Sequence, residues 1–256
     1  DYDPEQLKFS FALWTRKAIQ ELIKQLYDID MPLNTISDYL SRWGFTSQRP
    51  QKRAYERKDP EVQKWLKEEY PKIKKKAKKE GGEIHWGDET HVQSMPNNLK
   101  GFAPKGKTPT LKHTAKKLKI NMISSITNLG VVRFMTYRDS MNASKFITFL
   151  KRLIKASKRK VFLIVDNLRV HHAKKVKEWL STVEDKIEVY YLPAYCPDLN
   201  PDEYLNCDLK RNVHGQNVAK NQADLENNTR SFMRKLQRNP KRGKAYFRHE
   251  KIAYAS

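Results

Sequence analysis

Three acidic residues lie in short motifs whose composition could support metal chemistry. They are Asp88 in HWGDET, Asp166 in LIVDNLRVHH and Glu203 in LPAYCPDLNPDEYLN. Each is expected at a strand end or a helix start, and such ends can converge on one point of a folded α/β domain. Carboxylate oxygens suit Mg²⁺, and two such ions can activate a nucleophile and stabilise a leaving oxygen. We predict that these acids are catalytic residues and metal ligands.

The sequence around Asp166 gives stronger evidence for a functional role than the sequence around Asp88. Asp166 follows the fully apolar segment 161–165, which predicts a buried strand, and open α/β sheets bind ligands beyond the carboxyl ends of their strands. Asp88 is expected to end a strand and is followed by Glu89. Alternation along a strand sends these neighbouring side chains to opposite faces, so only one of them can face a shared site.

The third acid has a competing structural interpretation. Glu203 stands three residues after Asn200, with Pro201 at the first helical position, and this spacing also fits a helix-capping box. The residues around Glu203 therefore leave capping and metal binding both open. Asn167, directly after Asp166, is expected to support the site by orienting a metal-bound water or a neighbouring carboxylate.

Composition points to a polyanionic partner. The 256 residues include 51 Lys and Arg against 29 Asp and Glu, a net charge of +22, which favours nucleic acid. No apolar run approaches the ~18 residues that span a bilayer, and no signal-peptide pattern opens the chain, so no membrane partner is expected. Cys196 and Cys207 form no CxxC pair, which fits a reducing intracellular compartment.

Residues 1–57 are predicted to form a small helical DNA-binding module. Two short amphipathic helices are separated by a brief turn; the second covers 33–43, with Asn34 or Thr35 as its cap and Gly44 after its end. This arrangement resembles a helix-turn-helix, and the basic stretch after it could form a wing. The residues expected to contact DNA here are Asn34, Thr35, Ser37, Arg42, Arg49 and Arg53.

Three further segments are basic: one before the expected catalytic domain, one within it and one after it. Residues 58–81 are predicted to be a basic helical linker, whose lysines fit a solvated face or phosphate contacts equally well. The acid-free loop 100–119 is expected to contact phosphates. Its assigned DNA contacts are Lys105, Lys107, Lys112, Lys116 and Lys117. Residues 221–256 are predicted to form a basic helical tail, a flexible arm that orders on DNA or a partner subunit.

Residues 82–220 alternate between strand and helix patterns. A first strand is expected over 83–89, followed by a hairpin that turns at 128–130, and then by helices alternating with the strands 161–165 and 187–192. This order predicts an α/β domain: a ribonuclease-H-like mixed sheet with helices on both faces. The small helical, winged-helix-like module precedes it.

The motifs together resemble the DDE transposases of bacterial insertion sequences related to the mariner superfamily. The resemblance covers nearly the whole chain and is carried by FSFALWT, RWGFTSQRPQKRAY, HWGDET, GFAPKGKTP, VDNLRVHHAKKVKEWL and LPAYCPDLNPDEYLN. By this resemblance Asp88, Asp166 and Glu203 match the catalytic triad, and the Asn-Pro-x-Glu pattern selects Glu203 over Asp202. His171 matches the family's Asp-Asn-x-x-x-His pattern, which implies contact with the scissile phosphate or positioning of a carboxylate.

The resemblance implies a metal-dependent enzyme that hydrolyses phosphodiester bonds at transposon ends and joins the 3′ hydroxyl to target DNA. Two Mg²⁺ ions, replaceable by Mn²⁺, a TA target and a homodimeric synaptic complex are further implications. So are double-stranded terminal inverted repeats as substrate and a cytoplasmic, nucleoid-associated location in a bacterium. The helix pair would be the second of two DNA-binding modules, with the first missing from this chain.

Two other functions fit the same residues. One is a transposase-derived DNA-binding protein without catalysis, against which the presence of all three acids argues. The other is a structure-selective nuclease of the same fold, which would cut DNA without terminal repeats and need no helix-turn-helix. Cleavage of a terminal-repeat substrate with Mg²⁺ separates these possibilities.

Overall fold

The computed structural model describes residues 4–48, 50, 54–94, 102–108, 110, 114–215 and 219–256. The chain divides into two units, Asp1–Arg53 and Ala54–Ser256. The second unit therefore contains the sheet together with the segments that the sequence predicts as a linker and a tail. We describe the two units separately.

The first unit is built on two helices. Its elements are η1 (Pro4–Leu7), α1 (Arg16–Tyr27) and α2 (Leu33–Arg42). The Thr15 side chain caps α1 by accepting a hydrogen bond from the backbone N–H of Ala18 at 3.2 Å. Ala18 and Ile36 are buried, and the Arg16 guanidinium donates to the Ser37 hydroxyl of α2 at 3.1 Å. The pair of helices expected from the periodicity is therefore present.

The start of α2 differs from the expectation, whereas its end agrees. Asn34 or Thr35 was expected to cap this helix, but α2 begins earlier, at Leu33, and Pro32 occupies the cap position without a side-chain hydrogen bond. Proline presets the backbone for helix entry, which explains the earlier start. The predicted stop is confirmed: Gly44 has φ +80°, the left-handed conformation in which glycine commonly follows a helix.

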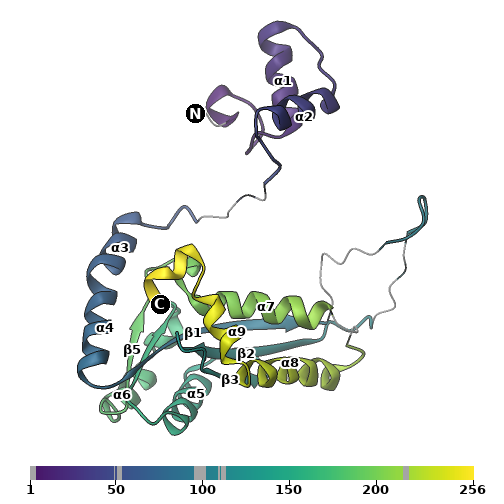
Figure 1. Ribbon diagram of the computed structural model, residues 1–256. Coiled ribbons are helices and arrows are strands. Elements are labelled where there is room, and N and C mark those ends of the chain that lie inside the picture. The colour runs from purple at the N-terminus through teal and green to yellow at the C-terminus, as the bar shows by residue number, and fades with distance from the viewer. Residues whose placement is uncertain are drawn as a thin grey trace. The chain divides into compact units, whose positions relative to one another are not determined.

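A five-stranded mixed sheet forms the centre of the second unit (Figure 1). Its strands are β1 (Glu83–Gln93), β2 (Lys119–Ile126), β3 (Val132–Tyr137), β4 (Val161–Val165) and β5 (Ile187–Tyr191). The spatial order is β3-β2-β1-β4-β5; β1 pairs antiparallel with β2 and parallel with β4. The hairpin between β2 and β3 turns at Gly130, which has φ +79°. This is the mixed sheet that the order of elements predicts.

Helices cover both faces of the sheet (Figure 1). They are α3 (Asp59–Lys64), the π-helix η2 (Trp65–Glu69), α4 (Tyr70–Lys79), α5 (Ala143–Ala156), η3 (Arg169–His172), α6 (Lys174–Ser181), η4 (Pro197–Leu199), α7 (Pro201–Gly215), α8 (Gln222–Gln237), α9 (Pro240–Tyr246) and η5 (Glu250–Ala255). In β4, Phe162 and Ile164 pack toward α4, α7 and α8, whereas Leu163 and Val165 pack toward α5 and α6. Among the described residues, no helix has the length and apolar character needed to cross a membrane.

Strand β1 is longer than the sequence predicts. A strand ending at Glu89 was expected, but β1 continues to Gln93 because its second half pairs with β2, with Asp88 opposite Ser124. Thr90 and Val92 are buried in this extension. Asp88 therefore lies within a paired strand rather than at its end, which restricts its backbone more than a strand terminus would.

The helix from Asp59 to Lys79 packs against the sheet unit through buried Val62, Trp65 and Ile73. One of its lysines is engaged inside the unit: Lys76 Nζ lies 2.6 Å from Glu188 Oε2. The apolar stripe expected in this segment thus packs on the core.

The C-terminal segment does not form the flexible arm that its charge led us to expect. Helix α8 buries Leu225, Phe232 and Leu236 in the larger core, and η5 buries Ile252. The Tyr254 hydroxyl donates to the backbone oxygen of Leu199 at 2.8 Å, just before α7. The basic side chains occupy the other side of an amphipathic helix, so charge density alone was a poor guide to packing.

A truncation on α8 should therefore destabilise the protein. Leu236→Ala removes a side chain that is 2 % exposed, and we expect a loss of roughly 2–5 kcal/mol in the free energy of unfolding. The neighbouring Lys235 is exposed, and Lys235→Ala should cost less than about 0.5 kcal/mol. Denaturant unfolding of both variants measures the difference; equal small effects would restore the free-arm interpretation.

Candidate active site

One pocket of about 710 Å³ brings together the three predicted acids. Asp88 reaches it from β1, Asp166 from the end of β4 and Glu203 from the first turn of α7. The remaining wall includes Asn167, Leu168, Leu192, Tyr195 and Asn200. Segments far apart in sequence thus place three carboxylates around one opening, as the motif positions predicted.

Asp88 is the most enclosed of the three pocket carboxylates. Its side chain accepts a hydrogen bond at Oδ2 from Asn206 Nδ2 at 2.8 Å. Burial, and then the negative charges of Glu203 and Asp202, raise the pKa of Asp88 well above its ordinary value. Asn206 lies one turn after Glu203 on α7, so the same helix face supplies one pocket acid and supports another.

Asp166 lies directly after β4, with 38 % of its side chain exposed. The strand ends where the apolar run predicted it would. Burial, and then the charge of Glu89, raise the pKa of Asp166 to about 6, although His171 and a hydrogen bond from the Leu168 backbone oppose this shift. Asp166 is thus more exposed than Asp88, and the negative charges of Glu89 and Glu203 both act on it.

The structure separates Glu203 from its neighbour Asp202. Asp202 is fully buried and accepts a hydrogen bond from the Ser124 hydroxyl at 2.6 Å, whereas Glu203 lines the pocket. Asn200 fixes this arrangement. Its side-chain oxygen accepts from the Asp202 N–H at 3.1 Å, and its amide donates to the Gly87 backbone oxygen at 2.9 Å, beside Asp88. Burial raises the pKa of Glu203, and Lys210 opposes that shift.

The donor set fits a divalent cation. Asp88, Asp166 and Glu203 offer hard oxygen ligands around one pocket, and the charges of the other two acids contribute to the raised pKa of Asp88. A cation between these carboxylates would remove that repulsion. The residues could therefore hold Mg²⁺ or Mn²⁺.

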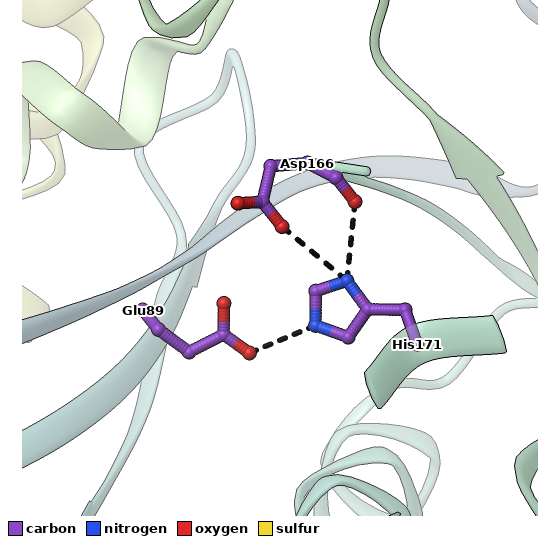
Figure 2. A group of neighbouring side chains, drawn as sticks. All are labelled: Glu89, Asp166 and His171. Atoms are coloured by element: carbon purple, nitrogen blue, oxygen red, sulfur yellow. Dashed lines mark hydrogen bonds and ion pairs between the residues drawn. The ribbon is translucent and has the colours of Figure 1, made fainter. Parts of the chain in front are cut away.

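A second group of possible ligands shares Asp166 with the pocket. Glu89, Asp166 and His171 place ligand atoms within 4.8 Å of one another (Figure 2). Burial alone would lower the pKa of His171, but the hydrogen bonds and charges of Glu89 and Asp166 raise it above its ordinary value. Glu89 thus has a defined partner, and the alternation that separates it from Asp88 agrees with the sequence analysis.

Several supporting residues were not identified from the sequence. Asn200, Asn206 and Ser124 each contact a pocket acid or its neighbour, and Glu89 contacts His171. Helical spacing from Glu203 was the available signal for Asn206. Asn167, which was predicted, lines the pocket, and its side-chain oxygen bonds the His172 ring.

The predicted DNA contacts lie on surfaces of both units. In α2, Asn34 and Arg42 are exposed, whereas Thr35 and Ser37 are half-buried, and Ser37 also donates to the Leu33 backbone oxygen. In the basic loop, the exposed lysines are Lys105, Lys107, Lys116 and Lys117. Arg49, Arg53 and Lys112 lie outside the described residues.

Two known families match this chain, each over a different range of residues. Residues 83–226 match the DDE superfamily endonuclease family, and residues 10–69 match the winged helix-turn-helix family. No curated protein matches the chain.

Solved structures share the fold. The Mos1 strand transfer complex is 18% identical, with a TM-score of 0.59 over 95% of this chain and 78% of that chain. The Mos1 mariner paired-end complex with Mn is 16% identical, with a TM-score of 0.62 over 99% of this chain and 78% of that chain. The catalytic domain of Mos1 mariner transposase is 15% identical, with a TM-score of 0.51 over 80% of this chain and 97% of that chain. The predicted ribonuclease-H-like fold with a preceding helical module is confirmed.

Proposed function

The chain belongs to the DDE superfamily endonuclease family, and on that premise we propose that it is a DNA transposase. It hydrolyses phosphodiester bonds at the terminal inverted repeats of a mobile element and joins the freed 3′ hydroxyl to target DNA. The observation that carries this proposal is the convergence of Asp88, Asp166 and Glu203 on one pocket. The net charge of +22 supports a DNA substrate. The shared fold with strand transfer and paired-end complexes of Mos1 supports the same function.

Asp88, Asp166 and Glu203 would hold Mg²⁺ or Mn²⁺. We infer two ions, which when bound supply an activated water or hydroxyl nucleophile and charge stabilisation at the leaving oxygen. The protein's own contribution is orientation. Asn206 fixes one oxygen of Asp88, and Asn200 ties the start of α7 to β1, so that Glu203 and Asp88 keep a constant relation. His171 supports Asp166 from the segment after β4, and Asn167, which lines the pocket, would orient a metal-bound water.

Recognition of DNA is assigned to two surfaces. The first unit would read the terminal repeat through exposed Asn34 and Arg42 of α2, helped by Thr35, Ser37, Arg49 and Arg53. The basic loop would contact phosphates through Lys105, Lys107, Lys112, Lys116 and Lys117, giving affinity and salt dependence rather than sequence choice. We further propose a homodimer in the synaptic complex, a TA target and activity at the nucleoid in the cytoplasm.

The deciding experiment incubates the protein with labelled duplexes that end in the terminal repeat, with and without Mg²⁺. A transposase cuts at the repeat and, when target DNA is added, yields joined products. Binding without cleavage in Mg²⁺ would instead identify a non-catalytic DNA-binding protein. Equal cleavage of duplexes lacking the repeat would identify a structure-selective nuclease.

A further inference from the structure

We propose that Glu89 is a positioning residue of the active site, holding the Asp166 carboxylate in place through His171. Glu89 carries no assigned role in the metal site, because β1 sends it to the face opposite Asp88. This role rests on the proposed function, since Asp166 is a catalytic ligand only if the pocket cleaves DNA.

The three residues form a continuous chain of contacts (Figure 2). Glu89 Oε1 lies 2.8 Å from His171 Nε2. The other ring nitrogen, His171 Nδ1, lies 3.1 Å from the backbone oxygen of Asp166 and 3.3 Å from its Oδ1. The imidazole thus bridges the Glu89 carboxylate and the backbone oxygen of Asp166, and it lies beside Asp166 Oδ1, a buried atom with no hydrogen-bond partner among the described residues.

The ring has little freedom to choose other partners. His171 is 0 % exposed, and its ring centre lies 4.4 Å from that of Phe146, which is also fully buried. The His171 backbone N–H donates to the Leu168 backbone oxygen at 3.0 Å, within the segment that carries Asp166. A buried imidazole that lost Glu89 would keep an unsatisfied nitrogen, which costs free energy and favours rotation of the ring. Glu89 therefore defines the ring orientation that Asp166 meets.

Exposure to the pocket distinguishes a positioning residue from a direct metal ligand. Asp88, Asp166 and Glu203 line the pocket, whereas Glu89 and His171 are absent from its wall. The Glu89 side chain is only 11% exposed. A phosphate in the pocket would therefore meet Asp166 and not the pair behind it. Supports of this kind orient a metal ligand, and their loss typically costs roughly 10–100-fold in metal affinity or activity.

The test compares Glu89→Ala, Glu89→Gln, His171→Ala and the double variant Glu89→Ala/His171→Ala. Two quantities are measured: the affinity for Mn²⁺ in the absence of DNA, by calorimetry, and the rate of terminal-repeat cleavage in Mg²⁺. Glu188→Gln is the matched control. Glu188 is also a strand glutamate, with a side-chain exposure of 21%, but it lies on the edge strand β5. It forms ion pairs with Lys76 and Lys160.

We expect Glu89→Ala to lower both quantities by roughly 10–100-fold and Glu89→Gln, which keeps an acceptor, to lower them less. The double variant should be no worse than His171→Ala alone, because both changes remove one path to Asp166. Glu188→Gln should behave as the unaltered protein. Circular dichroism establishes that each variant is folded, and Glu89→Gln preserves side-chain shape if the alanine variant unfolds.

Three results would overturn the assignment. Glu89→Ala and Glu89→Gln could match Glu188→Gln, which would leave Glu89 without a role. Additive effects in the double variant would break the path through His171. Loss of Mn²⁺ binding in Glu89→Gln as complete as in Asp166→Asn would make Glu89 a direct ligand. Failure of the unaltered protein to cut DNA would count against the proposed function alone, because Mn²⁺ binding still reports on Glu89.

Discussion

Asp166→Asn should abolish cleavage of terminal-repeat DNA while leaving DNA binding intact. Asparagine keeps the shape of the side chain at the end of β4 but removes the charge that a divalent ion requires. The loss should exceed the roughly 100-fold upper end found for residues that only support a ligand, because Asp166 itself lines the pocket. Single-turnover cleavage in Mg²⁺ measures the loss, and a mobility-shift assay on the same duplex measures binding.

Asp185→Asn provides the control for this substitution. Asp185 is exposed and follows α6, outside the pocket wall. The Asp185→Asn variant should cut and bind terminal-repeat DNA as the unaltered protein does. Cleavage retained by Asp166→Asn would remove Asp166 from its catalytic role, and a parallel loss of binding would show that the substitution disturbs more than the metal site.

The parts of the site that were predictable are those encoded by local pattern. The apolar run before Asp166 identifies a buried strand, and that strand ends at Val165. Alternation within β1 separates Asp88 from Glu89, as their different partners show. In each case one short segment contains the whole signal, because strand geometry repeats every two residues.

The supporting contacts required the tertiary structure. Asn200 bonds Gly87 across 113 positions in the sequence, and Glu89 meets His171 across 82. Periodicity within a segment carries no information about which segments become neighbours. The family resemblance selected Glu203 over Asp202, but the residues around them gave no physical reason for that choice. Both are acidic residues in one helical turn, and the structure shows that Asp202 is buried with Ser124 of β2 and Asn200 as its hydrogen-bond partners.

The basic composition of the C-terminal segment led to a wrong prediction of how that segment packs. The C-terminal segment is rich in lysine and arginine, yet α8 and η5 complete the larger core. A helix can present a basic face to solvent and an apolar face to a sheet, so composition averaged over the segment hides the stripe that matters.

Asp88→Asn should stabilise the metal-free protein while weakening its response to Mg²⁺. Burial is the largest cause of the raised pKa of Asp88, and the negative charges of Glu203, Asp202, Glu89 and Asp166 raise it further. Above that pKa the charged Asp88 is repelled, and asparagine relieves the repulsion. A gain on the order of 1 kcal/mol corresponds to a rise of roughly 2–4 °C in melting temperature for a unit of this size.

The pH dependence of this gain has a defined sign. The pKa of Asp88 is higher in the folded protein than its ordinary value of 3.8, so the folded state holds the proton where the unfolded state has lost it. Stability of the unaltered protein therefore falls as pH rises from about 4 through the folded pKa. Relative to the unaltered protein, Asp88→Asn should gain no stability below pH ~4 and should gain the most above the pKa that Asp88 has in the folded state.

With Mg²⁺ present, the unaltered protein should become more stable than Asp88→Asn. An ion that binds only the folded state at 100 times its dissociation constant adds about 2.7 kcal/mol, and the unaltered protein should show this increase in thermal unfolding. Asp88→Asn should gain much less, because one of three ligands is gone, and the exposed control Asp185→Asn should respond fully. Equal stabilisation of Asp88→Asn by Mg²⁺ would place the metal elsewhere, and Glu89, Asp166 and His171 would then be the alternative ligand set.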